Sequence, residues 1–216
     1  MSMREELAEL IGTFTLVFIG AGAGALAASN GSGLVGVALA HGLALMVIVY
    51  AWGAISGAHV NPAVTFGVAL AGRMEWGKAI RYWVAQLLGA GLAGLLLRWL
   101  LGETGGLGMT LPGNGVSAAQ AVAIEAILTF FLVIAVFGSA VAGRNGNAAG
   151  LAIGMVLAMD ILMGGSLTGA SMNPARTFGP ALALMRFGDA WIYVVGPLIG
   201  GGLAALVYDR VFIRAA

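Results

Sequence analysis

The stretch between Glu9 and Arg73 contains no Asp, Glu, Lys or Arg. A helix that crosses a bilayer needs about 20 apolar residues, so this stretch is long enough for two spans and a third, shorter membrane element. Charged residues make up only 9% of the 216-residue chain, against about 25% in soluble domains. The composition therefore indicates an integral membrane protein. It argues against a soluble enzyme, a disordered chain and, at a net charge of +1, a nucleic-acid binder.

Uncharged runs in the rest of the chain complete a set of six predicted membrane spans. They cover residues 5–28, 34–55, 76–101, 117–141, 148–165 and 189–212. Turn-forming residues separate several of these spans, at 29–33, at 104–115 and in the segment Arg144-Asn145-Gly146-Asn147. The first span lacks a basic n-region and is too long for a signal peptide, so we expect it to remain in the protein.

The basic residues predict the orientation. An even number of spans places both termini on one side, and seven basic residues then share that side against three elsewhere. The seven are Arg4, Arg73, Lys78, Arg81, Arg144, Arg210 and Arg214, and the three are Arg98, Arg176 and Arg186. Because Lys and Arg accumulate in cytoplasmic loops, we expect cytoplasmic termini. The short termini favour a prokaryotic plasma membrane as the location.

The chain contains an internal repeat. Residues 57–67 and 169–179 share Gly-Ala-x-x-Asn-Pro-Ala-x-Thr-Phe-Gly, and residues 82–90 resemble 193–201. Glu9 has a counterpart in Glu125. The single channel domain, 1–216, therefore divides into repeats of about 1–103 and 116–216. Three spans per copy force the two copies to insert with opposite topology, related by a pseudo-two-fold axis in the membrane plane.

The repeated Asn-Pro-Ala stands where a helix would begin, because Asn is a good N-cap and Pro suits the first helical position. The apolar segments that follow, Pro62–Gly72 and Pro174–Leu184, are too short to span a bilayer. We expect two half-helices that enter from opposite faces, with their N-termini meeting near the midplane. The preceding segments, 57–60 and 169–172, would be non-helical backbone, which survives at this depth only beside a cavity or inside protein.

These motifs, in SGAHVNPAVTFG and TGASMNPARTFGPAL, closely resemble those of the aquaporin (major intrinsic protein) family, and the resemblance covers the whole chain. It implies an all-α membrane fold of six transmembrane helices and two re-entrant half-helices. It also implies a homotetramer in the lipid bilayer with one pore in each protomer.

The two Asn-Pro-Ala boxes predict how a pore would exclude protons. The side-chain amides of Asn61 and Asn173 would both donate to one passing water, which then turns its hydrogens outward. Two positive helix ends add a barrier to cations. The boxes comprise Asn61, Pro62, Ala63, Asn173, Pro174 and Ala175, and the carbonyls expected to line the pore are those of Gly57, Ala58, His59, Gly169, Ala170 and Ser171. The alternative is that both Asn residues are simple helix caps.

Three acidic residues lie within predicted spans, where such groups are costly. We expect Glu9 and Glu125 to support the two pore loops by accepting backbone hydrogen bonds, an assignment that agrees with the family pattern; a proton relay is the alternative. Asp160 either tunes the selectivity filter or is satisfied against a neighbouring helix or protomer. His59 is expected to line the cytoplasmic half of the pore, with pH sensing as the alternative.

The resemblance implies a selectivity filter of His41, Ile161, Ala170 and Arg176. This set is most similar to that of the plant tonoplast intrinsic proteins, in which similar filters accompany water together with ammonia or other small neutral solutes. Thr177 and Ala181 are the choices typical of water channels in the family rather than of glycerol channels. For His41, the alternative role is that of a packed helix residue with a satisfied ring.

The predicted function is a passive channel for water, with ammonia or other small neutral solutes such as glycerol, that excludes protons and ions. A secondary transporter is the alternative, because inverted repeats with broken helices also occur in transporters. A structural or adhesive membrane protein is a third, weaker possibility. We expect no enzymatic activity, cofactor, metal or nucleic-acid partner.

The absence of cysteine from the chain yields a first prediction. Mercury salts block a pore by binding a thiolate, so they should leave the water permeability of proteoliposomes unchanged. Stopped-flow light scattering measures this directly. Potent inhibition at low mercury concentration would contradict the prediction.

Overall fold

The computed structural model describes residues 3–143 and 146–214, and these residues form helices and loops without strands. Six helices are long and apolar enough to cross a membrane, as predicted. They are α1 (Arg4–Asn30), α2 (Gly33–Ser56), α4 (Trp76–Leu101), α5 (Ala118–Val136), α6 (Ala149–Thr168) and α8 (Ile192–Val207). π-Helical turns extend α5 through Phe137–Val141 and α8 through Tyr208–Ile213, and a 3₁₀ turn at Gly146–Ala148 precedes α6. Residues Arg144 and Asn145 of the predicted turn lie outside the described residues.

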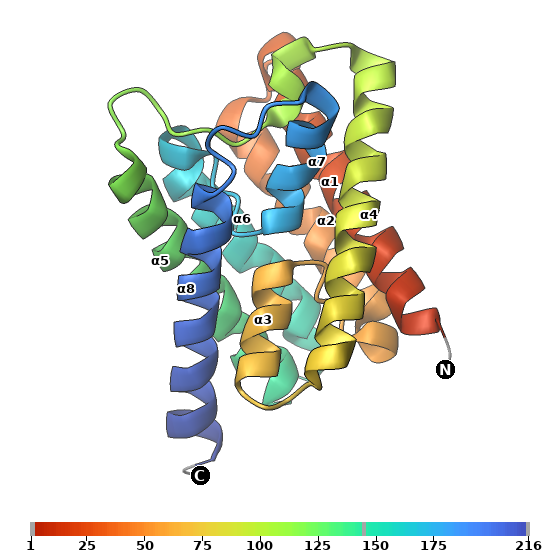
Figure 1. Cartoon of the computed structure of the whole chain (residues 1–216), viewed down its shortest axis with the longest axis vertical. Coiled ribbons are helices and arrows are strands. Elements are labelled where there is room, and N and C mark those ends of the chain that lie inside the picture. The colour runs from red at the N-terminus through yellow and green to blue at the C-terminus, as the bar shows by residue number, and fades with distance from the viewer. Residues whose placement is uncertain (1–2, 144–145, 215–216) are drawn as a thin grey trace.

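Two short helices, α3 (Pro62–Leu70) and α7 (Pro174–Leu184), are the predicted half-helices. Figure 1 shows α3 in the lower half of the bundle and α7 in the upper half, both between α8 and α4. α7 has the expected bounds, whereas α3 ends two residues before the predicted Gly72. Ala71 is its C-cap, and Gly72 follows with a φ of 74°, a left-handed conformation that terminates helices.

The packing repeats the sequence repeat. α1 packs against α2 and α4, and α5 packs in the same way against α6 and α8. α2 meets α6 across the centre, while each half-helix packs on the last span of the other repeat, α3 on α8 and α7 on α4. The two repeats are therefore interlocked, and both termini lie toward the same end of the bundle (Figure 1).

Glycines set the distance between these helices. A Cβ on Gly94 would overlap the carbonyl of Gly179 where α4 crosses α7, and one on Gly200 would overlap the carbonyl of Ala126 where α8 crosses α5. Backbones approach this closely only where side chains are absent, which is how membrane helices gain packing contact. Glycine abundance, 36 of 216 residues, thus has a packing role at these crossings.

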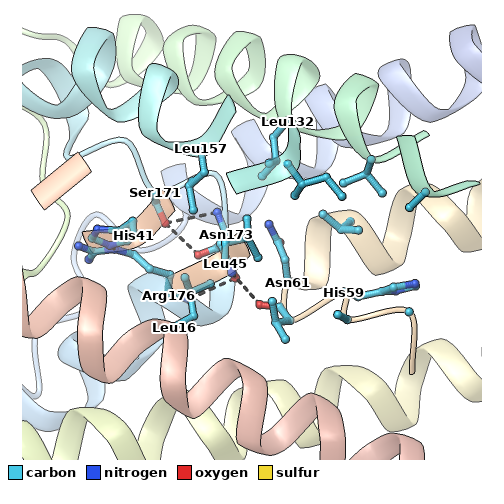
Figure 2. A pocket seen from close by; sticks show the side chains of 17 residues that line it. Leu16, His41, Leu45, His59, Asn61, Leu132, Leu157, Ser171, Asn173 and Arg176 are labelled. Atoms are coloured by element: carbon cyan, nitrogen blue, oxygen red, sulfur yellow. Dashed lines mark hydrogen bonds between the residues drawn. The ribbon is translucent and has the colours of Figure 1, made fainter. Parts of the chain in front are cut away.

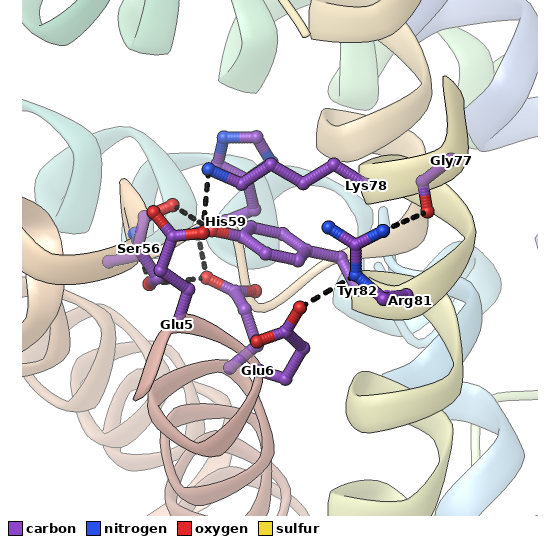
Figure 3. Close-up of polar contacts among 10 residues, drawn as sticks. Glu5, Glu6, Ser56, His59, Gly77, Lys78, Arg81 and Tyr82 are labelled. Atoms are coloured by element: carbon purple, nitrogen blue, oxygen red, sulfur yellow. Dashed lines mark hydrogen bonds and ion pairs between the residues drawn. The ribbon is translucent and has the colours of Figure 1, made fainter. Parts of the chain in front are cut away.

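Ion pairs gather at the end of the bundle that carries the termini. Lys78 and Arg81 of α4 pair with Glu5 and Glu6 of α1, with N–O distances of 2.8 Å in both pairs, and they surround Tyr82 (Figure 3). Because these side chains are partly exposed, each pair contributes no more than about 1 kcal/mol. Their chief consequence is to join the starts of α1 and α4.

The segment between α4 and α5 has a feature that the turn residues did not predict. Thr104–Gly108 forms a single turn with left-handed dihedrals at Gly105, Gly106 and Leu107. Gly105 and Gly108 lie so close to the backbone of α1 that neither has room for a Cβ. This turn anchors the segment on α1 and directs the residues that follow it toward α7.

The close helix crossings predict that two glycine-to-alanine substitutions differ in their effect on the free energy of unfolding. Gly200→Ala should lower the free energy of unfolding by about 1–3 kcal/mol, because α5 and α8 must separate to admit the methyl group. Gly53→Ala is the matched control, because a Cβ there meets only Val49 Cγ1 at 3.8 Å and alanine favours the helix by up to about 1 kcal/mol. Thermal unfolding in detergent tests both; equal midpoints for Gly200→Ala and the unmodified protein would refute the argument.

Candidate functional site: a pore between two half-helices

The loops before the half-helices, residues 57–60 and 169–172, share one unusual backbone conformation. Ala58, Val60, Ala170 and Met172 have φ values of 49°, 41°, 46° and 53°. Left-handed dihedrals cost non-glycine residues about 1–3 kcal/mol each and persist only where the surroundings fix them. Each loop therefore needs support from outside itself.

Glu9 of α1 provides this support for the first loop. Its Oε1 accepts hydrogen bonds from the His59 amide (2.9 Å) and the Ser56 hydroxyl (2.7 Å). Its Oε2 accepts from the Val60 amide (2.7 Å) and from Gln86 Nε2 of α4 (2.8 Å). Glu9 is fully buried, so its lone pairs are satisfied by the loop and by α4.

Glu125 of α5 makes the equivalent contacts to the second loop. Its Oε1 accepts from the Thr168 hydroxyl (2.8 Å) and the Ser171 amide (2.9 Å), and its Oε2 accepts from the Met172 amide (2.7 Å). Both intramembrane glutamates thus have backbone amides as partners. This geometry is compatible with the structural role expected for both residues.

Sequence reasoning missed the groups that complete these supports. Tyr82 of α4 donates to the Ser56 carbonyl (2.8 Å), and Tyr193 of α8 donates to the Thr168 carbonyl (2.6 Å). The hydroxyl oxygens of Ser56 and Thr168 each accept a hydrogen bond from the backbone amide two residues later in the chain. The resemblance of 82–90 to 193–201 was the available signal, since it aligns the two tyrosines.

The Asn-Pro-Ala boxes begin the half-helices as predicted. Asn61 Oδ1 accepts from the Ala63 amide at 2.8 Å. Asn173 Oδ1 accepts from the amides of Ala175 and Arg176, at 3.0 and 3.2 Å. The side-chain carbonyls are therefore the caps, and the side-chain NH₂ groups remain for other partners.

Those NH₂ groups join the two repeats. Asn61 Nδ2 donates to the Met172 carbonyl and Asn173 Nδ2 donates to the Val60 carbonyl, both at 2.8 Å. The sequence predicted free amides at both positions. Instead each amide uses one hydrogen to hold the opposite loop, and its second N–H is left for a molecule in the cavity.

A narrow cavity runs past both boxes. Its volume is about 30 Å³, enough for about two ordered waters. Figure 2 shows His41 and Arg176 at one end, Asn61 and Asn173 in the middle, and His59 toward the other end. Its walls comprise Leu16, His41, Leu45, Gly57, Ala58, His59, Val60, Asn61, Val64, Leu132, Val136, Ala140, Ile153, Leu157, Ser171, Asn173 and Arg176. A file of polar groups thus follows one side of an otherwise apolar passage.

Two of the four expected filter residues meet at the end of this cavity. Arg176 Nε donates to His41 Nε2 at 3.3 Å, and Arg176 Nη1 donates to the Gly108 carbonyl at 2.6 Å. His41 Nδ1 lies 2.9 Å from the Val37 carbonyl, so Nδ1 carries the ring proton and Nε2 is the acceptor. The buried guanidinium is therefore held between α2 and the left-handed turn.

The other two expected filter residues are buried in the apolar core. Ile161 and Ala170 are buried in one apolar cluster with Leu128 and Leu157, and of these four only Leu157 lines the cavity. Among the expected pore carbonyls, those of residues 57–59 and Ser171 belong to lining residues, whereas Gly169 and Ala170 do not.

Two further singled-out residues have defined surroundings. His59 Nδ1 lies 3.1 Å from the Thr65 hydroxyl, which fixes the ring at the cavity wall. Asp160 is buried, and its Oδ2 has no hydrogen-bond partner among the described residues. Asp160 does not line the cavity.

Comparisons with known proteins agree with this architecture. A family model described as Major intrinsic protein matches residues 1–208. Aquaporin TIP4-4 from Zea mays is 47% identical over 98% of this chain and 87% of its own length, and Aquaporin TIP2-1 from Arabidopsis thaliana is 44% identical over 100% and 90%. The solved aquaglyceroporin from Plasmodium falciparum superimposes with a TM-score of 0.85 at 27% identity, covering 99% and 98% of the two chains. Because these curated relatives are plant proteins, the expected prokaryotic plasma membrane finds no support.

Because Glu125 contacts the second loop, its removal is predicted to reduce water conduction. Glu125→Ala leaves the amides of Ser171 and Met172 buried without acceptors, at a cost of about 1–3 kcal/mol each, so the loop should leave its strained conformation. We expect water permeability per reconstituted protein to fall at least ten-fold in stopped-flow assays. Glu103→Ala, which removes an exposed carboxylate, should conduct normally. Wild-type flux through Glu125→Ala would show that the carboxylate does not hold the loop.

Proposed function

Since this chain belongs to the major intrinsic protein (aquaporin) family, it is a passive, multi-pass membrane channel for water, and we propose that its pore also admits ammonia and other small neutral solutes such as glycerol. One observation carries the proposal: the contact of His41 with Arg176 at one end of the cavity. The relation to a solved aquaglyceroporin supports including glycerol among the solutes.

The proposed filter has two polar groups and an apolar wall. The remaining N–H groups of Arg176 would donate to the oxygen of a solute, and its fixed charge repels cations. With its Nε2 occupied by Arg176, His41 has no ring nitrogen left to accept from a solute. Ile161 and Ala170, which we assign to the filter from the family pattern, offer no hydrogen bonds. Neutral molecules with one acceptor atom suit this arrangement better than ions do.

Asn61 and Asn173 are the proposed centre of the water file. Each amide keeps one N–H after holding the opposite loop, so one water oxygen would accept two hydrogen bonds at this point. That water would then direct both hydrogens away along the file and would have no lone pair to accept a proton in line. The carbonyls of Gly57, Ala58, His59 and Ser171 would accept those hydrogens on either side. We assign the carbonyls of Gly169 and Ala170 to the same file, at a greater distance from its centre.

We further propose a homotetramer with cytoplasmic termini. The tetramer rests on the family pattern and on apolar faces that α2 and α6 expose side by side. These faces include Val35, Leu39, Leu43 and Val47 of α2 and Leu151, Met155, Met159 and Leu162 of α6. The orientation rests on Lys78, Arg81 and the other basic residues at the end of the bundle where the termini lie.

A secondary transporter, the alternative from the sequence, is not favoured. The paired half-helices are joined by reciprocal hydrogen bonds, and the family model and the aquaporin relatives favour a channel. The deciding measurement is osmotic shrinkage of proteoliposomes. Fast flux with a low activation energy is expected, whereas saturable, ion-dependent uptake would contradict a channel.

The filter assignment makes its own prediction. His41→Phe combined with Ile161→His should narrow selectivity toward water, because a bulky ring and a new polar group fill the proposed constriction. Permeabilities for water, ammonia, methylamine, glycerol and urea should be compared in one vesicle preparation. Ammonia and methylamine flux should fall several-fold relative to water; an unchanged ratio would show that these positions do not form the filter.

A further inference from the structure

The ring of His41 occupies space that is free because residue 20 of α1 is a glycine. A Cβ on Gly20 would lie 2.4 Å from both Cδ2 and Nε2 of His41 and 2.8 Å from its Cε1. Real Cβ atoms essentially never come this close to other heavy atoms, so the ring and a side chain at residue 20 exclude each other. The His41 ring therefore lies directly on the backbone of α1.

Backbone contacts hold both helices where they meet. Gly42 follows the histidine in α2 and is packed against α6, because a Cβ on Gly154 would lie 2.4 Å from the Gly42 carbonyl oxygen. Ala21 of α1 is packed against the turn after α4, because a Cβ on Gly108 would lie 2.2 Å from the Ala21 carbonyl oxygen. A side chain at residue 20 would thus meet the ring between two helices whose backbones are already in tight contact with other elements.

Hydrogen bonds fix the ring in the same place (Figure 2). His41 Nδ1 lies 2.9 Å from the Val37 carbonyl, and Nε2 accepts from Arg176 Nε at 3.3 Å. Nε2 is also one of the two ring atoms nearest to Gly20, and ordinary contact begins at 3.4 Å. A methyl group there would move Nε2 by about 1 Å, while its bond to Arg176 is already longer than the usual limit of about 3.2 Å. We therefore expect the displaced ring to lose Arg176 and to move toward the cavity that it lines.

The second repeat fills the equivalent space in another way. Aligning the two buried glutamates places Val136 opposite Gly20, and aligning the two Asn-Pro-Ala boxes places Ile153 opposite His41. Val136 and Ile153 both line the same cavity. The isoleucine side chain reaches less far from its backbone than a histidine ring does, which leaves room for valine. The long ring of the first repeat needs the empty space that glycine provides.

From this geometry we infer that Gly20 is a specificity-determining residue of the pore: because it has no side chain, His41 can lie against α1, accept from Arg176 and leave the cavity open at the filter. With a methyl group at residue 20, the ring would turn toward the cavity. Arg176 would keep only the second of its two acceptors, the Gly108 carbonyl. The inference rests on the proposed filter, which it extends to α1.

A first test follows the position of the ring without any solute. The chain has two histidines, so protein with ¹⁵N-labelled histidine gives ring signals from two residues, and His41→Ala identifies those of His41. Gly20→Ala should shift the Nε2 signal, because the hydrogen bond from Arg176 is lost. Gly22→Ala is the matched control, since a Cβ there would meet the flexible end of Leu97 at 3.2 Å. An unchanged His41 signal in Gly20→Ala would overturn the inference.

A second test measures selectivity. The readout is the ratio of glycerol permeability to water permeability in one preparation of proteoliposomes. Gly20→Ala should lower this ratio at least three-fold, because the displaced ring narrows the cavity, and Gly22→Ala should keep the wild-type ratio. An unchanged or higher ratio in Gly20→Ala would count against the inference.

The double variant Gly20→Ala/His41→Ala separates the effect of the ring from general damage. Without the ring, the methyl group at residue 20 has room, so the double variant should have the same ratio as His41→Ala. If Gly20→Ala does not assemble, assembly of the double variant identifies the ring as the obstacle, whereas failure of both would contradict the inference. Absence of glycerol flux through the unmodified channel would instead refute the proposed glycerol conduction, and the histidine signals would still decide the role of Gly20.

Discussion

The reciprocal hydrogen bonds between Asn61 and the Met172 carbonyl, and between Asn173 and the Val60 carbonyl, are the contacts on which the rest of the structure depends. They join two helix N-termini that face each other inside the protein, where their aligned dipoles would otherwise repel. Each carbonyl brings negative partial charge to the opposite helix end. The price is four left-handed residues in two loops, which explains why carboxylates are buried nearby despite the cost of placing them in a membrane.

Both repeats support their strained loop with equivalent residues, and they differ only in part. A glutamate of the first span, a hydroxyl before the loop and a tyrosine of the third span recur in each copy. The copies diverge where the third span packs, because Gln86 has no polar counterpart in α8. The left-handed turn after α4 also makes a contact without an equivalent in the first repeat, since the Gly108 carbonyl binds Arg176. The segment between the repeats thus packs on α1 of the first repeat and holds a side chain of the second.

Sequence reasoning predicted the spans and the half-helices because each depends on local composition or on an exact internal match. Periodicity alone does not determine depth within the packed bundle. Ile161 and Leu157 lie one turn apart on the same helix, and the filter role assigned to Ile161 stays a prediction. Nor does any pattern reveal that Asn61 and Asn173 each use one side-chain N–H on a carbonyl of the opposite loop, Met172 and Val60 respectively. The left-handed turn was not predicted because its glycines are equally typical of an ordinary loop.

The glycine crossings also bear on mechanics. Where α4 meets α7 and α8 meets α5, carbonyl oxygens sit against α-carbons with no side chain between them. Helices in such contact cannot slide or tilt past one another without first moving apart, and α4 with α7 joins one repeat to the other. The α4–α7 crossing thus fixes the distance between one helix of each repeat, and a side chain added at Gly94 or Gly179 would push the two repeats apart.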